Sequence, residues 1–101
     1  MSEARVNQVK AMIRDALLPF KDKLGARRVM FFGSRVAGTA RERSDFDVAI
    51  DGCEPVEIRV FSQMCESLEE LPTLYRVDLV DLATVSAAVR AEMLKQVEVI
   101  W

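Results

Sequence analysis

The chain has 101 residues, of which half are apolar and 30% are charged, with a formal net charge of -2 and a pI of about 5.2. This size and composition predict one globular domain, residues 1–101, with a single core. The acidic balance argues against nucleic acid as a partner, and the absence of histidine excludes Ser-His and Cys-His nucleophile pairs and histidine-containing zinc sites.

Membrane association and disulfide bonding are not expected. No apolar run approaches the roughly 18 residues of a membrane span, and the chain does not open on a signal-peptide pattern. Cys53 and Cys65 lack metal-binding spacing and are interpreted as reduced thiols. We therefore expect a cytoplasmic protein. Any catalysis at neutral pH is expected to rely on carboxylates and a bound cation.

Residues 3–18 predict the first helix, with Ser2 as a candidate N-cap and Pro19 at its end. Apolar side chains recur at helical spacing and indicate a face packed on the core. These are Val6, Val9, Ile13, Leu17 and Phe20. A further turn over residues 20–24 is expected to stop at Gly25.

The apolar run from Arg27 to Phe32 predicts a short buried strand. Gly33 follows it and allows the backbone to approach a ligand closely, because glycine has no Cβ. Residues 34–38 are expected to begin a helix whose free N–H groups face an anion. Three arginines add positive charge near that helix: Arg35, Arg41 and Arg43. A solvated loop is the other interpretation of these arginines.

Residues 45–51 alternate between acidic and apolar side chains and predict a second strand. Asp45 and Asp47 are two residues apart, so their carboxylates leave the same face of that strand. Aspartate is a poor strand former, which favours a functional reason for the pair, although Asp45 also suits a turn or cap.

The rest of the chain predicts a helix over residues 55–71, a strand over 75–82, and a helix over 84–96. The tail VEVIW is expected to form an edge strand or to pack on the first helix. Within the third strand, Asp78 lies in the middle of an apolar run, where a carboxylate requires a partner or a metal. Asp81 lies near the end, where a loop can solvate it, so Asp78 is taken as the third acid of the site.

Three carboxylates near a glycine turn suit a phosphoryl-transfer site with two cations. Asp45 and Asp47 would share the metal ions, and Asp78 would bind the second ion and help to receive a proton. Gly33 and Ser34 would hold the terminal phosphates, with Arg35 and Arg43 as further nucleotide-binding residues.

The pattern Gly33-Ser34, ten residues, Asp45-x-Asp47 resembles the signature of DNA polymerase beta-type nucleotidyltransferases. The fuller run GSRVAGTARERSDFDVAI, followed by RVDLVDL, is similar to the minimal nucleotidyltransferase (MNT) subgroup, and the resemblance covers nearly the whole chain. It implies an α+β nucleotidyltransferase fold. We expect a small, mostly antiparallel mixed sheet of three or four strands with helices mainly on one face and the acidic face left open.

The resemblance also implies an activity. Similar proteins are often antitoxins encoded beside a helical HEPN-type protein, and several transfer AMP from ATP to a tyrosine of that partner with Mg²⁺. Another possibility is a binding module that neutralises a helical partner by forming a complex, with weak catalysis or none. Transfer to a small molecule such as an antibiotic, or to RNA, is less favoured, the latter because of the acidic pI.

Overall fold

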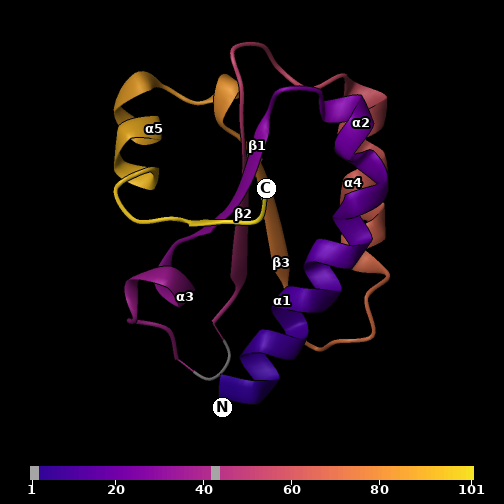
Figure 1. The fold of residues 1–101 in the computed structure, drawn as a ribbon. Helices are drawn as coiled ribbons and strands as arrows, with labels where there is room; N and C mark the ends of the chain where they lie inside the picture. The colour runs from indigo at the N-terminus through magenta and orange to yellow at the C-terminus, as the bar shows by residue number, and fades with distance from the viewer. Residues whose placement is uncertain (1–2, 42–43) are drawn as a thin grey trace.

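A four-stranded mixed sheet forms the centre of the protein (Figure 1). The computed structural model describes residues 3–41 and 44–101. The strand order is β3-β2-β1-β4, with β1 antiparallel to β2 and β4 and with β2 parallel to β3. The strands are β1 (Arg28–Phe32), β2 (Phe46–Asp51), β3 (Val77–Asp81) and β4 (Glu98–Val99). The predicted mixed, mostly antiparallel sheet is confirmed.

The two long helices lie together on one side of the sheet, as expected (Figure 1). The helices are α1 (Glu3–Leu17), α2 (Lys21–Leu24), α3 (Ser34–Ala37), α4 (Ile58–Glu69) and α5 (Ala87–Met93). Short 3₁₀ turns follow α1 (η1, Leu18–Phe20) and β3 (η2, Leu82–Thr84). Helix α5 lies on the other side of the sheet, where Met93 packs against the cluster that includes Met30 and Ala49, so the helices lie mainly, though not only, on one face, as predicted. No helix within the described ranges is both long and apolar enough to cross a bilayer.

The main core lies between the sheet and helices α1 and α4. Alternate residues of the central strands enter it, because side chains of a strand point to opposite faces in turn. Its completely buried members include Val29, Phe46, Val48, Ile50, Ile13, Leu17 and Met64. Burying each such side chain stabilises the fold by about 1.5–3 kcal/mol. Asp47, which follows Phe46, must therefore point to the opposite face.

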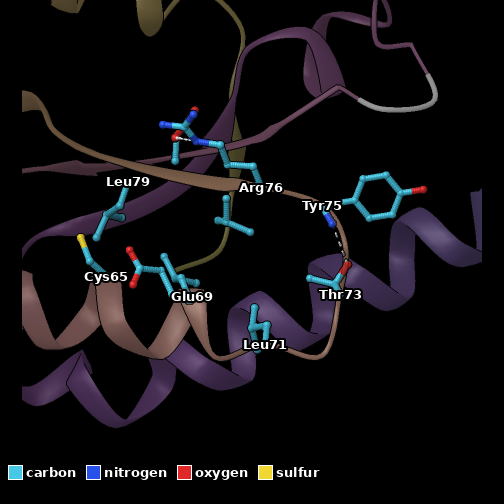
Figure 2. A pocket seen from close by; sticks show the side chains of 10 residues that line it. Cys65, Glu69, Leu71, Thr73, Tyr75, Arg76 and Leu79 are labelled. Atoms are coloured by element: carbon cyan, nitrogen blue, oxygen red, sulfur yellow. Dashed lines mark hydrogen bonds and ion pairs between the residues drawn. The ribbon is translucent and has the colours of Figure 1, made fainter.

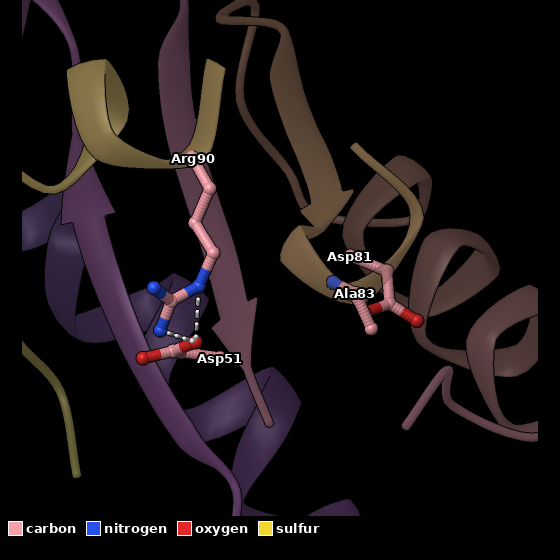
Figure 3. A network of polar contacts seen from close by, with 4 residues as sticks. All are labelled: Asp51, Asp81, Ala83 and Arg90. Atoms are coloured by element: carbon pink, nitrogen blue, oxygen red, sulfur yellow. Dashed lines mark hydrogen bonds and ion pairs between the residues drawn. The ribbon is translucent and has the colours of Figure 1, made fainter. Parts of the chain in front are cut away.

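That opposite face is only partly covered. Met30, Ala49 and Leu82 form a smaller buried cluster, against which Met93 of α5 packs. Arg90 Nη2 donates to Asp51 Oδ1 over 2.8 Å and ties α5 to the end of β2 (Figure 3). Asp47 lies at the other end of β2 and stays partly exposed. The acidic end of this face is thus open.

The predicted start of the long second helix was wrong. Helix α4 begins at Ile58 rather than at Pro55, because the Glu57 carboxylate caps it by accepting from Val60 N–H over 3.1 Å. The Arg27 guanidinium donates to the backbone carbonyls of Glu54 and Pro55 and holds them outside the helix. The predicted edge strand in the tail is confirmed by β4, which pairs with β1.

Asp81 is structural, as predicted, but it is buried and not solvated by a loop. Its side chain points to the core face and is 7% exposed. Oδ2 accepts from Val56 N–H over 2.7 Å. Oδ1 accepts from Ala83 N–H over 3.0 Å, and Figure 3 shows Asp81 and Ala83 beside each other. The carboxylate therefore fixes both the approach to α4 and the turn η2.

We expect Asp81→Ala to lower the free energy of unfolding by about 2–3 kcal/mol, because buried N–H groups lose a charged acceptor. Urea denaturation of the purified variant measures this loss. Asp81→Asn, which keeps one acceptor oxygen, should lose less. An unchanged denaturation midpoint for the alanine variant would show that these bonds add nothing to stability.

Candidate active site

Two carboxylates lie side by side at the open end of the sheet. Asp47 of β2 and Asp78 of β3 are direct partners in the parallel register. Side chains at paired positions of neighbouring strands leave the same face, with backbones about 4.8 Å apart. Asp45 was expected on the strand but lies one residue before β2 begins. Asp47 and Asp78 thus share one end of one face, and Asp45 lies close enough to act electrostatically on Asp47.

The electrostatics of Asp47 reflect this crowding of negative charge. Partial burial raises the pKa of the Asp47 carboxyl, and the charges of Asp78 and Asp45 raise it further. Each of the three carboxylates would gain from a cation placed among them, because opposite charge relieves their repulsion. The site is therefore electrostatically suited to a metal ion.

The glycine turn touches the Asp47 carboxylate. Gly33 has a φ of 79°, a conformation that other residues rarely adopt. A Cβ on Gly33 would overlap Asp47 Oδ2 and would lie 3.2 Å from Asp47 Cγ. The register explains the contact, since Phe32, just before Gly33, pairs with Asp47. Glycine is required here both for backbone conformation and for space.

Ser34 begins α3, directly after this turn. The N–H groups of Val36 and Ala37 donate to the Gly33 carbonyl over 3.1 and 3.0 Å, which fixes the first turn of the helix on the glycine. Gly38, with a φ of 80°, ends it. The short helix predicted for residues 34–38 is confirmed. The assignment of Gly33 and Ser34 to the phosphates stays a prediction.

Arg35 occupies a place that sequence reasoning did not predict. Its guanidinium carbon lies 4.5 Å from the Phe46 ring centroid and 5.5 Å from that of Tyr75. Arg35 Nη2 also donates to the Ser44 carbonyl over 2.6 Å. Phe46 points to the core face, so this guanidinium lies across the strand from the Asp47 carboxylate. In this arrangement Arg35 holds the segment that carries Asp45, and its predicted contact with the nucleotide stays a prediction.

We expect Arg35→Lys to impair the site nearly as much as Arg35→Ala, with a loss of activity of about 10- to 100-fold, because only the planar guanidinium stacks on both rings while it holds the Ser44 carbonyl. Steady-state rates of both variants and the parent measure the effect. Full activity of the lysine variant would instead indicate that the positive charge acts on the phosphates.

The other predicted arginines are less informative. Arg43 lies outside the described residues. Arg41 and Ser44 exchange two hydrogen bonds: Arg41 N–H donates to Ser44 Oγ over 2.8 Å, and Ser44 N–H donates to the Arg41 carbonyl over 3.0 Å. These bonds join Arg41 to Ser44, the residue before Asp45.

The Asp78 carboxylate forms an ion pair with an arginine of the same strand region, Arg76. Arg76 Nε lies 2.9 Å from Asp78 Oδ1. Within residues 3–41 and 44–101 no set of three acidic or cysteine side chains is arranged to hold a metal ion as it stands. The donor chemistry nevertheless fits a hard divalent cation, which prefers carboxylate oxygens, and Asp78 becomes available once Arg76 releases it. Arg76 is largely exposed, so this exchange costs little.

The chain matches known proteins over most of its length. The family model described as Polymerase beta, Nucleotidyltransferase matches residues 19–101. A probable protein adenylyltransferase MntA of Haemophilus influenzae is 40% identical over 72 residues, 71% of this chain. That match spans 62% of the Haemophilus protein. The protein adenylyltransferase MntA of Thermococcus cleftensis is 29% identical over 97 residues, 96% of this chain and 97% of that protein.

Two solved structures share the fold. A toxin–antitoxin crystal structure with AMP-PNP aligns with 87% of this chain and 72% of that chain, at a TM-score of 0.58 and 21% identity. A mutant of the toxin–antitoxin MntA-HpeT aligns with all of this chain and 73% of that chain, at a TM-score of 0.62 and 19% identity. At these identities the likeness shows the shared fold alone.

Proposed function

The chain belongs to the polymerase beta-type nucleotidyltransferase family, in its MntA-like group, and from this we propose that it transfers AMP from ATP to a hydroxyl group of a partner protein. The observation that carries the proposal is the contact of the Gly33 turn with Asp47, beside Asp78 on the next strand. A phosphate-approaching turn and paired carboxylates on one open face are the parts that transfer from a metal-bound nucleotide requires.

Each residue of the candidate site has its own proposed role. Asp45 and Asp47 would hold Mg²⁺, with two ions expected, and Asp78 would complete the second site. Bound Mg²⁺ supplies charge neutralisation for the triphosphate and lowers the pKa of the acceptor hydroxyl. Gly33 N–H and the Ser34 hydroxyl would hold the terminal phosphates. These residues also fix the orientation of the nucleotide, since they lie at one end of a rigid sheet.

The proposed reaction is a single displacement at the α-phosphorus. The acceptor oxygen forms a new bond to that phosphorus, while the bond between the α-phosphorus and the bridging oxygen breaks and pyrophosphate leaves. The hydroxyl proton passes to a carboxylate, for which Asp78 is the candidate, and from there to water. No redox step is involved.

We propose that the acceptor is a helical HEPN-type protein encoded nearby and that this chain is the antitoxin of the pair. Two similar proteins are named MntA adenylyltransferases, and two structures of the same fold are toxin–antitoxin complexes. A binding module that neutralises the partner without chemistry is the alternative, and the experiment below separates the two.

The test uses the purified chain, Mg²⁺, ATP labelled at the α-phosphate, and the product of the neighbouring gene. We expect a Mg²⁺-dependent labelled band at the mass of the partner, absent with the Asp45→Asn/Asp47→Asn variant. An unlabelled partner that still co-purifies with both forms of the chain would contradict transfer and support the binding module.

A further inference from the structure

Strand β3 is the outer strand of the sheet on the side of the active site. In the described part of the chain it pairs only with β2. Phe46 N–H donates to the Arg76 carbonyl over 2.9 Å, which sets which residues of β3 face β2. In a parallel strand every second residue directs both its N–H and its C=O group toward the same neighbouring strand. Since Arg76 faces β2, the next residue, Val77, and Leu79 after it direct their backbone groups away from the sheet. This edge presents backbone donors and acceptors at both residues that flank Asp78.

An open groove runs beside this edge, between β3 and the end of α4 (Figure 2). Its volume is about 370 Å³. Leu68 and Leu71 line it from the side of α4, and Val77 and Leu79 line it from the strand. All four side chains are apolar and lie on the core face of the sheet. The groove therefore offers apolar contacts on the core face of the sheet, and polar residues that include Thr73, Arg76 and Asp78 complete its lining.

The rim of the groove is acidic. Glu69 lines it, and Figure 2 shows its carboxylate facing Cys65 and the strand. Glu66 and Glu70 are exposed on the same last turns of α4. The one basic lining residue, Arg76, is paired with Asp78. The charge of this surface is complementary to a basic segment of another protein.

We propose that the outer edge of β3 is the docking site for an extended, basic segment of the acceptor protein. The segment adds to the sheet as a further strand and bonds to the backbone groups of Val77 and Leu79. Its side chains alternate between the two faces. Apolar side chains enter the groove, and the residue between them points to the acidic face, where its hydroxyl lies beside Asp78. This inference rests on the proposed function and specifies how the acceptor is presented.

The proposal predicts a sequence pattern for the acceptor: a hydroxyl-bearing residue between two apolar residues, with lysine or arginine nearby. The probe is a blocked peptide, Lys-Arg-Val-Tyr-Val-Arg-Lys, carrying a fluorophore. We expect it to bind the full chain and to slow amide hydrogen exchange at Val77 and Leu79. Two N-methylated peptides test the strand geometry: one is methylated at both valines and the other at the tyrosine. N-methylation removes a backbone donor, and only alternate N–H groups of the peptide face β3, so one methylated peptide should bind more weakly than the other. Equal binding of both forms would overturn the proposal.

The acidic rim is tested by Glu69→Lys/Glu70→Lys, which changes exposed side chains only. We expect about tenfold weaker peptide binding and slower labelling of the partner, with unchanged affinity for Mg²⁺ and AMP-PNP. Asp15→Lys/Asp22→Lys makes the same change of charge on exposed positions of α1 and α2 and serves as the matched control. Equal effects of the two variants would contradict a specific docking site.

The nucleotide measurement keeps the two proposals separate. If the chain binds Mg²⁺ and AMP-PNP but neither the peptide nor its methylated forms, the docking site is wrong and the proposed function stands. If it binds no nucleotide, the proposed function itself fails, and the docking proposal fails with it.

Discussion

Replacing Asp47 by asparagine should abolish transfer and at the same time stabilise the metal-free protein. The rate should fall by about a thousandfold or more, because a lost metal ligand removes several kcal/mol of charge stabilisation. Stability should rise because Asp47 is partly buried beside Asp78 and Asp45, and its charged form is unfavourable without a cation. A residue kept only for structure would show the opposite change in stability.

The gain in stability should depend on pH. A carboxyl whose pKa is raised on folding contributes its full stability below its unfolded pKa, near 4, and loses it as the pH rises through the folded value. The Tm difference between Asp47→Asn and the parent should therefore be small at low pH and should grow toward neutral pH. Differential scanning fluorimetry at several pH values, in chelator, measures it. A Tm below that of the parent at pH 7 would show that Asp47 has a stabilising partner.

Gly33→Ala should reduce activity nearly as strongly as the loss of Asp47. The added Cβ would overlap Asp47 Oδ2, and the φ of 79° is unfavourable for alanine. The carboxylate must then move, and a displacement of about 1 Å at a reacting centre can cost about 100-fold in rate. We expect at least that loss in the labelling assay, together with a lower Tm.

Gly38→Ala is the matched control, because it separates backbone strain from contact with the carboxylate. Gly38 has a φ of 80°, yet a Cβ there would meet nothing within 4 Å. This variant should lose about 1–2 kcal/mol of stability but keep its rate once folded. Equal loss of rate in both variants would indicate that strain in α3, and not the overlap with Asp47, disturbs the site.

Local sequence patterns predicted part of the geometry of the candidate site. Alternation along the strands is consistent with Asp47 and Asp78, which are paired positions of β2 and β3, whereas Asp45 lies one residue before β2. The assignment of the three acids to a metal site stays a prediction. Gly33 was identified as a close-approach position, although the group that approaches it, Asp47, became visible only in the structure. That contact depends on the register between β1 and β2, which no local pattern specifies.

Features that depend on distant contacts could not be predicted. The nucleotide contact of Arg35 stays a prediction, whereas its position over the rings of Phe46 and Tyr75 is visible only in the structure, because both residues lie far along the chain. Asp81 was expected near the end of its strand, solvated by a loop, because its two N–H donors, at Val56 and Ala83, belong to another segment and to the following turn. Helix α4 begins later in the chain than predicted, because the helix starts after the capping residue Glu57 and not at Pro55.

The most direct test of the proposed site is to locate the cation. Mn²⁺ replaces Mg²⁺ at oxygen ligands and broadens the NMR signals of nearby amides. With Mn²⁺ and AMP-PNP bound, we expect the amide signals of Gly33, Asp47 and Asp78 to vanish, while those of the buried faces of α1 and α4 survive. Broadening that is confined to other acidic surfaces, such as the end of α4, would contradict the assignment of Asp45, Asp47 and Asp78 as the metal site.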